Sequence, residues 1–290
     1  MTNIPGISHE YWKIGDIKMH VATSGEGEPV LLLHGFPELW YSWRKIIPML
    51  SDKYRIIAPD LRGYGMTDIP NSGYDIETLS NDIARIIDKI GDKTTIVCHD
   101  WGGVIGWHTA MTYPDRVKAL IPVAAPHVGR YFNVMLTNPF QFLKSQYIFF
   151  FQLPYLPEYL LSMSKGVVLT KLMKWSSVRS KTFSENELEV YRNAWENKSS
   201  INAGLNYYRK LFRNLPKIVK YYNENKVKCP VCVVWGDKDW FLSVALTEKL
   251  EKYCEYTPEV HILSDCGHWV SQEAPDELSG IIDSFIKNYQ

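Results

Sequence analysis

The stretch TTIVCHDWGGVIGWHTAMTYP, residues 94–114, decides the fold class of this chain. Its first part is a short, continuous apolar run, which is typical of a strand buried on both faces, and its second part is helix-like. Asp100 stands between the two parts, with small residues at Cys98, Gly102 and Gly103. Small residues are needed where a chain turns so sharply that strand and helix nearly collide. The stretch therefore predicts a tight strand–turn–helix elbow with a carboxylate at its tip.

A residue at the tip of such an elbow can serve as a nucleophile, or it can serve only to cap the helix. Some hydrolases present a serine nucleophile at the tip, in the pattern G-x-S-x-G. No G-x-S-x-G occurs in this chain, and Asp100 takes the corresponding position. Asp is also a common helix N-cap, so the stretch alone leaves a capping role open. The order of later residues favours a nucleophile, because hydrolases of this topology place an acid and then a histidine further along the chain.

Two later loops supply an acid and a histidine in that order. The segment CVVWGDKD contains Asp237 and Asp239, and the segment SDCGHW contains His268. Both segments follow strand-like runs, and open α/β sheets build their sites at such strand ends. His127, just past IPVAAP, is the rival for the general base. The remaining histidines fall in strand patterns, in a helix or beside turns, and they are His9, His20, His34, His99, His108 and His261.

Strand-like and helix-like segments alternate along most of the chain. Strands are expected at 10–15, 18–25, 29–35, 54–60, 94–99, 119–124, 232–237 and 258–263. The clearest helix covers 79–91, where isoleucines recur at helical spacing and Gly91 acts as a stop signal. This alternation predicts an α/β fold with an eight-stranded, mostly parallel sheet and helices on both of its faces.

The alternation breaks after the sixth expected strand, where the sequence becomes aromatic, basic and helix-like. We expect a helical cap at 131–220, inserted between a first core segment at 1–130 and a second at 221–290. The aromatic residues of the cap could line an apolar substrate tunnel, form the cap's own core, or rest on a membrane surface.

Composition narrows the possible partners and the location. Lys plus Arg and Asp plus Glu both total 32 in 290 residues, so the formal net charge is zero. A zero net charge predicts no long-range field that would concentrate nucleic acid, anionic lipid or acidic metabolites. The N-terminus lacks a basic segment followed by an apolar one, and no run approaches the roughly 20 apolar residues of a membrane span. We therefore expect a cytoplasmic protein with no nucleic-acid partner and no stable membrane insertion.

The five cysteines indicate reduced thiols rather than a disulfide framework, because their number is odd and most lie in strand patterns or beside turns. Cys229 and Cys232 form a C-x-x-C pair. No second pair with metal-ligand spacing accompanies them, and Cys232 belongs to a strand pattern, so a structural role is favoured over a redox or zinc role.

Five motifs carry a family resemblance: HGFPELWYSWR at 34–44, DLRGYG at 60–65, HDWGG at 99–103, WGDKD at 235–239 and DCGHW at 265–269. Together they resemble the epoxide hydrolases of the α/β-hydrolase superfamily, over essentially the whole chain. The resemblance implies the α/β-hydrolase fold with its helical cap. It also implies that substrate forms a covalent ester with one aspartate, which water activated by a histidine then hydrolyses.

The same resemblance implies a role for each residue of the site. Asp100 is the implied nucleophile, His268 the implied base, and Asp239 rather than Asp237 the acid that orients it. Tyr147 and Tyr208 are the implied ring-opening acids. Tyr207 is adjacent to Tyr208, and because neighbours on a helix point about 100° apart only one of them can face the site. The backbone N–H groups of Phe36 and Trp101 form the implied oxyanion hole, and both residues, with the two tyrosines, contact the implied substrate.

The implied substrate is a small apolar epoxide, converted to a vicinal diol by a monomer or homodimer that requires no metal or organic cofactor. Two alternatives share parts of this pattern. A haloalkane or haloacetate dehalogenase would use the same aspartates and histidine, with Trp101, Trp175 or Trp195 as possible halide donors; a fluoroacetate dehalogenase would need an arginine where Trp101 stands. A catalytically silent binding protein would keep the pocket alone, although titratable groups gathered in a pocket usually indicate chemistry.

Overall fold

The computed structural model describes residues 4–196 and 198–289, and an eight-stranded sheet runs through their centre. Its strands are β1 (Ser8–Ile14), β2 (Ile17–Ser24), β3 (Glu28–Leu33), β4 (Tyr54–Pro59), β5 (Thr94–His99), β6 (Val117–Val123), β7 (Cys232–Gly236) and β8 (Glu259–Leu263). Their spatial order is β1-β2-β4-β3-β5-β6-β7-β8. β2 pairs antiparallel with β1 and with β4, and the other neighbours pair in parallel. The predicted eight-stranded, mostly parallel sheet is confirmed.

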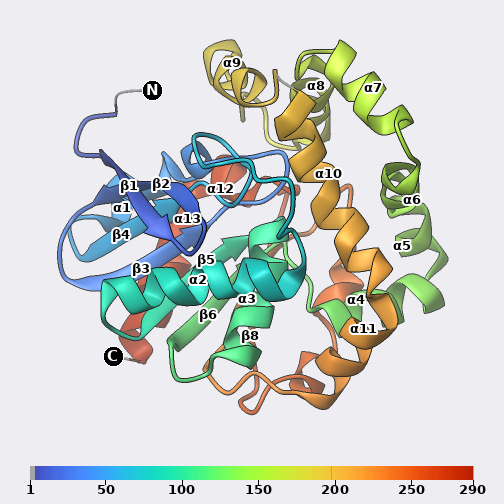
Figure 1. The fold of residues 1–290 in the computed structure, drawn as a ribbon. Helices are drawn as coiled ribbons and strands as arrows, with labels where there is room; N and C mark the ends of the chain where they lie inside the picture. Colours follow the sequence, from blue (N-terminus) through green and yellow to red (C-terminus); the bar gives the residue numbers. More distant parts are fainter. Residues whose placement is uncertain (1–3, 197, 290) are drawn as a thin grey trace.

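Helices cover both faces of this sheet, with α2 and α3 in front of it and α13 behind it in Figure 1. The helices outside the long segment between β6 and β7 are η1 (Trp40–Trp43), α1 (Ile46–Leu50), α2 (Ile76–Ile90), α3 (Asp100–Thr112), η2 (Val244–Thr247), η3 (Leu250–Lys252), α12 (Val270–Glu273) and α13 (Pro275–Asn288). The sequence sets the bounds of α2. Asp75 caps its first turn by accepting the Thr78 N–H, and Gly91 ends it at a φ of +92°.

The core divides into two apolar clusters because successive strand residues point to opposite faces of a sheet. On β3, Leu31 and Leu33 belong to the cluster beneath α2 and α3. Val30 and Leu32 belong to the cluster on the other face, together with Ile282 of α13. All four side chains are fully buried, which explains why residues 30–33 form an unbroken apolar run.

A helical insertion, defined as α4 to α11, separates β6 from β7. Its helices are α4 (Val128–Thr137), α5 (Pro139–Lys144), α6 (Gln146–Gln152), α7 (Leu156–Met163), α8 (Val167–Ser176), α9 (Glu185–Ala194), α10 (Lys198–Arg213) and α11 (Leu215–Glu224). Figure 1 shows α5, α6 and α7 along the outer side of the molecule and α10 between them and the sheet. Helices inserted after the sixth strand are therefore confirmed, as the sequence predicts.

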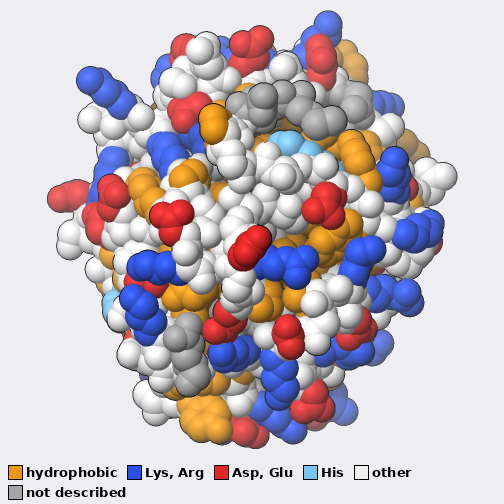
Figure 2. All heavy atoms as spheres, turned by 90° about the vertical axis from the view of Figure 1, so that its left-hand side faces the viewer, with side chains coloured by type: hydrophobic (Ala, Val, Ile, Leu, Met, Phe, Trp, Pro, Cys, Tyr) orange, Lys and Arg blue, Asp and Glu red, His pale blue; other side chains and the backbone are white. Residues whose placement is uncertain are grey.

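The face on the side of β1 and α1 is an ordinary mixed surface. Figure 2 shows basic and acidic side chains interspersed there, with small apolar areas between them.

Within residues 4–196 and 198–289, no helix is both long and apolar enough to span a bilayer. All five cysteines are buried free thiols.

Candidate active site

The elbow predicted at residue 100 joins β5 directly to α3. Asp100 has a φ of +46°, in the left-handed region where a side chain is strained. The turn closes only because its neighbours are small. A Cβ on Gly102 would lie 2.5 Å from the carbonyl oxygens of Leu33 and His34, and one on Gly103 would lie 2.0 Å from the Ala125 Cβ. Asp100 is the first residue of α3 and not its N-cap, so the capping interpretation is wrong.

The loops after β7 and β8 bring an acid and a histidine to this elbow. His268 Nδ1 lies 2.7 Å from Asp239 Oδ2, and its Nε2 lies 3.8 Å from Asp100 Oδ2. Because a carboxylate accepts the Nδ1 proton, Nε2 is left free to face Asp100. The other oxygen of Asp239 accepts the N–H groups of Phe241 and Leu242 at 2.7 and 2.9 Å, which fixes its orientation.

Asp237 and His127, the alternatives for the acid and for the general base, do not join this group. Asp237 accepts the N–H of Cys266 at 3.3 Å. The His127 ring stacks on Tyr253 with centroids 4.1 Å apart and meets Trp107 edge to face. Within the described ranges neither ring nitrogen of His127 has a hydrogen-bond partner, and burial lowers its pKa to about 3. The structure therefore joins Asp239, and not Asp237, to His268, and leaves His127 in an aromatic cluster outside the pocket.

The loop after β3 approaches the Asp100 carboxylate from the other side. The Phe36 N–H donates to Asp100 Oδ1 at 2.8 Å. A Cβ on Gly35 would lie 2.4 Å from the Asp100 Cβ, so only glycine permits this approach. The Phe36 ring points toward the helical insertion, where it meets Tyr208 and Trp195 edge to face. Its amide, and not its ring, is the group aimed at the carboxylate.

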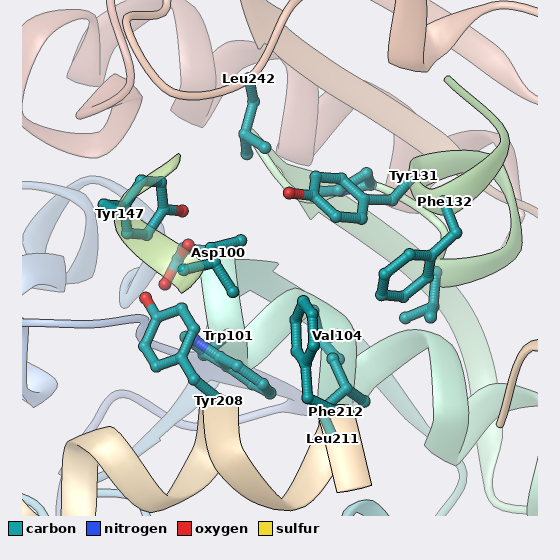
Figure 3. Close-up of a pocket in the computed structure, with 13 residues that line it drawn as sticks. Asp100, Trp101, Val104, Tyr131, Phe132, Tyr147, Tyr208, Leu211, Phe212 and Leu242 are labelled. Carbon is teal, nitrogen blue, oxygen red and sulfur yellow. The ribbon is translucent and has the colours of Figure 1, made fainter. Parts of the chain in front are cut away.

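A pocket of about 520 Å³, including its mouth, opens above Asp100. Figure 3 shows its wall, which is almost entirely apolar and aromatic. From the core it is lined by Asp100, Trp101, Val104, Pro126 and Leu242, and from the helical insertion by Val128, Tyr131, Phe132, Tyr147, Ile148, Tyr208, Leu211 and Phe212. A dry pocket with few polar groups suits an apolar small molecule.

Two of the three tyrosines considered from the sequence face this pocket. In Figure 3 the hydroxyl groups of Tyr147 and Tyr208 point toward the Asp100 carboxylate. Burial raises the pKa of both phenols well above 10, so both keep their protons at neutral pH. Tyr207 points the other way, and its hydroxyl donates to the Arg62 carbonyl at 2.8 Å. Tyr208 is thus the member of the adjacent pair that belongs to the site, as the resemblance implies.

A buried ion pair beneath the loop that carries His268 was missed by sequence reasoning. His99 Nδ1 lies 2.6 Å from Glu38 Oε2, and its Nε2 lies 2.9 Å from the His268 carbonyl oxygen. Burial alone would lower the pKa of His99, but Glu38 raises it to about 9. Burial opposes the charge of Glu38 as well, yet His99 lowers the Glu38 pKa to about 2. The charged pair therefore supports the backbone that carries His268.

Most of the apolar wall was also missed, although helical spacing carried a signal for part of it. Leu211 and Phe212 follow Tyr208 at three and four residues on α10, so all three share one helix face. Val128, Tyr131 and Phe132 repeat this spacing on α4. Nothing local marks Leu242, which reaches the pocket from the loop after β7.

Comparison with known proteins agrees with this geometry. The chain is 36% identical over 291 residues to epoxide hydrolase 4 of Homo sapiens, covering 97% of this chain and 79% of that protein. It is 35% identical over 291 residues to the AB hydrolase superfamily protein YfhM of Bacillus subtilis (strain 168), covering 98% and 99%. The crystal structure of epoxide hydrolase VrEH1 from Vigna radiata superposes with a TM-score of 0.86 at 33% identity, covering 98% and 99%.

The model of the α/β hydrolase fold family matches residues 28–275, which is most of the sheet and the whole helical insertion. Family membership thus rests on the full architecture and not on the elbow alone. The chain is a hydrolase that belongs to the α/β-hydrolase fold family and, within it, to the epoxide hydrolases.

Proposed function

We propose that this hydrolase converts apolar epoxides into vicinal diols through a covalent ester on Asp100. The observation that carries the proposal is the meeting of two protonated tyrosine hydroxyls, Tyr147 and Tyr208, with the Asp100 carboxylate in one apolar pocket. An epoxide opens when a nucleophile attacks carbon while an acid protonates the departing oxygen. We also propose that residues 131–220 act as the cap that supplies the acids.

In the first step, Asp100 Oδ2 attacks a ring carbon and the carbon–oxygen bond of the epoxide breaks. The resulting alkoxide takes a proton from Tyr147 or Tyr208, and the second hydroxyl stabilises it by hydrogen bonding. Asp100 needs no base to activate it because the carboxylate is already ionised. Asp100 Oδ1 stays on the Phe36 N–H and becomes the carbonyl oxygen of the ester.

In the second step, His268 Nε2 removes a proton from water, which attacks the ester carbon of Asp100. Negative charge then develops on Oδ1, where the N–H groups of Phe36 and Trp101 form the proposed oxyanion hole. Losing one such donor in comparable sites costs about 3 to 4 kcal/mol of transition-state stabilisation. Collapse of the intermediate expels the second oxygen of the diol, which takes the proton of the attacking hydroxyl group, and it restores the Asp100 carboxylate. The proton held by His268 returns to the tyrosine that was deprotonated in the first step, so this route uses only groups of the protein and water.

Dehalogenation is the alternative, and the positions of the tryptophans count against it. Trp195 Nε1 donates to the Pro37 carbonyl at 2.8 Å, so it is not free for a halide. Trp175 is 63% exposed and lies against Trp240, with the two rings tilted by 40°, outside the pocket wall. The Trp101 side chain is hydrogen-bonded to Tyr208. Turnover of styrene oxide, aliphatic epoxides, bromoalkanes and fluoroacetate would separate the two activities, and turnover of bromoalkanes with no epoxide hydrolysed would favour the alternative.

Trapping the ester tests the mechanism directly. If His268 serves only the second step, His268→Gln should accumulate an adduct on Asp100 after mixing with styrene oxide. Intact-protein mass spectrometry should then show an increase of one substrate mass, and peptide mapping should locate it in β5–α3. Asp100→Asn is the control and should form no adduct. Continued turnover by His268→Gln without any adduct would mean that water attacks the epoxide directly.

A further inference from the structure

The outer side of the helical insertion carries a concentration of exposed apolar side chains. Of the twenty large apolar residues that stand exposed in the described chain, eleven lie between residues 136 and 163. They form what we call the apolar face: Leu136, Phe140, Phe142, Leu143, Phe149, Leu153, Tyr155, Leu156, Tyr159, Leu160 and Met163. Exposed apolar side chains concentrated on one run of helices in a folded protein indicate an interaction site.

The apolar face is almost free of charge. Between residues 136 and 163 the sequence contains one lysine, Lys144, one glutamate, Glu158, and no Arg or Asp. Lys144 is turned inward and donates to the Asp239 carbonyl. Glu158 is paired with Arg209, whose Nη2 lies 3.1 Å from its Oε2. Neither charge is therefore left to hydrate the surface of α5, α6 and α7.

Basic residues border this face, and they reveal an uneven charge distribution. Residues 128–224, the helical insertion, contain 14 Lys and Arg but only 6 Asp and Glu, a net charge of +8 in a chain whose total is zero. Lys165 stands exposed just before α8 and Lys171 stands exposed on it. Arg213 is the exposed last residue of α10, and Lys220 is exposed in the middle of α11. The zero total therefore hides a strongly basic helical insertion opposite an acidic core.

The apolar face is continuous with the pocket wall through a chain of aromatic rings. The Phe142 ring meets Phe149, and Phe149 meets Phe212, each with centroids 5.9 Å apart. Phe212 meets Phe132 at the same separation, and both of these residues line the pocket. Ring contacts therefore connect side chains on the outer surface with side chains that line the pocket.

We propose that the apolar face docks on an anionic lipid membrane, with α5, α6 and α7 against the acyl–headgroup boundary and the basic border on the lipid headgroups. Aromatic and leucine side chains flanked by lysine and arginine are the chemistry that binds such an interface. A second copy of the chain is a poorer occupant, because a two-fold contact would press two helical insertions of like charge together. This docking is peripheral and involves no spanning helix.

Vesicle binding tests the proposal without reference to catalysis. The protein is mixed with vesicles of phosphatidylcholine alone and with vesicles of equal parts phosphatidylcholine and phosphatidylglycerol, and both mixtures are separated by flotation. We expect binding to the anionic vesicles, weaker binding to the neutral ones, and loss of the difference at high ionic strength, where the charges are screened.

Two triple variants give matched tests of the surface. Phe140→Ser, Leu143→Ser and Met163→Ser together should weaken binding to anionic vesicles by at least about tenfold. Met49→Ser, Tyr256→Ser and Val260→Ser remove exposed apolar side chains outside the helical insertion and should leave binding unchanged. None of the six residues lines the pocket, so unchanged epoxide turnover in vesicle-free buffer checks that each variant is folded.

Three outcomes would overturn the proposal. The first is no binding to anionic vesicles by the wild type. The second is equal loss of binding in both triple variants. The third is a wild-type dimer in size-exclusion chromatography that becomes a monomer in the Phe140→Ser, Leu143→Ser and Met163→Ser variant, with no vesicle binding by either protein. That result would assign the apolar face to a second copy of the chain. A failure of the epoxide assay alone would bear on the proposed reaction and not on this surface.

Discussion

At the scale of single residues, the site depends on one strained position and the groups that hold it. A φ of +46° at Asp100 costs on the order of 1–3 kcal/mol for a residue with a side chain. The Phe36 N–H and the absence of a Cβ at Gly35 keep the carboxylate in place from one side. The strain has a chemical use, because it exposes the carboxylate at the tip of the elbow, facing the pocket.

Mutation should separate the proposed role of the two pocket tyrosines from that of Asp100, the proposed nucleophile. Tyr147→Phe or Tyr208→Phe removes one hydrogen-bond donor without leaving a cavity, so ester formation should slow by about 10- to 1000-fold. The double variant leaves the alkoxide without a nearby proton donor and should show no detectable ring opening. Stopped-flow measurement of ester formation checks this, with circular dichroism to confirm folding. Tyr207→Phe is the neighbouring control; if it were the damaging change, the assignment of Tyr208 would be wrong.

The buried Glu38–His99 pair predicts a pH dependence of stability. Because the folded pKa of His99 is about 9 and its ordinary value is 6.5, the pair's contribution is complete below pH 6.5 and is lost as the pH rises through 9. The lowered pKa of Glu38 adds stability above pH 4.5 that is lost as the pH falls toward 2.

Glu38→Gln should therefore lower the free energy of unfolding near pH 7 by about 3 kcal/mol and flatten its decline between pH 6.5 and 9. Urea unfolding at a series of pH values measures both effects. The exposed Asp88–Arg116 pair offers a control, since Asp88→Asn should change little at any of these pH values. An undiminished alkaline decline in Glu38→Gln would show that another group titrates there.

At the scale of elements, the close approach of α3 to β6 rests on glycine. A Cβ on Gly103 would lie 2.0 Å from the Ala125 Cβ, so Gly103→Ala should force the helix outward and destabilise the protein by about 1–3 kcal/mol. Gly280 of α13 has open space around it, and Gly280→Ala should stabilise the protein by up to about 1 kcal/mol. Thermal unfolding of the two variants compares them, and equal effects would contradict the packing explanation for the elbow.

The elements differ in how far their sequence predicts them. The central parallel strands β5, β6 and β7 were predictable because buried parallel strands have long apolar runs, and the elbow was predictable because its small residues adjoin an aspartate. The edge strands β1 and β8 have mixed sequences and few fully buried side chains, so short β-like segments were the only signal for them. The eight helices of the insertion were predicted only as one helical region, since their short lengths and turns depend on packing against one another. The Glu38–His99 contact joins residues 61 positions apart, and no local sequence pattern predicts a contact over that separation.

At the scale of the whole molecule, polar contacts around η1 help to hold the helical insertion to the core. Arg44 of the core donates through Nε to Glu187 of α9 at 2.9 Å and through Nη1 to Gln272 of α12 at 2.5 Å. Trp195, just past α9, donates to the Pro37 carbonyl. The orientation of the insertion over the elbow therefore depends on polar contacts around η1 as well as on the apolar pocket wall.

Arg44→Gln should loosen α9 selectively. Losing the charged contact should reduce the free energy of local opening there by about 2 kcal/mol, while the parallel strands keep their protection. Hydrogen–deuterium exchange resolved by peptide is the measurement, with Arg116→Gln as the control because its ion pair is exposed. Uniformly faster exchange across the sheet would mean that Arg44 stabilises the core and not the attachment of the insertion.

The helical insertion supplies most of the pocket wall, with eight of its thirteen residues on α4, α6 and α10. The carboxylate belongs to the core, on the first residue of α3 directly after β5. Natural variation or laboratory selection can therefore reshape what the pocket admits within one contiguous stretch of gene, without altering the elbow or the loops that carry Asp239 and His268. A library confined to Phe132, Ile148, Leu211 and Phe212 would sample new molecular shapes against an unchanged reactive centre. For the same reason, recombination could exchange the helical insertion between related proteins. Such an exchange would change substrate selectivity and would leave Asp100, Asp239 and His268 in place.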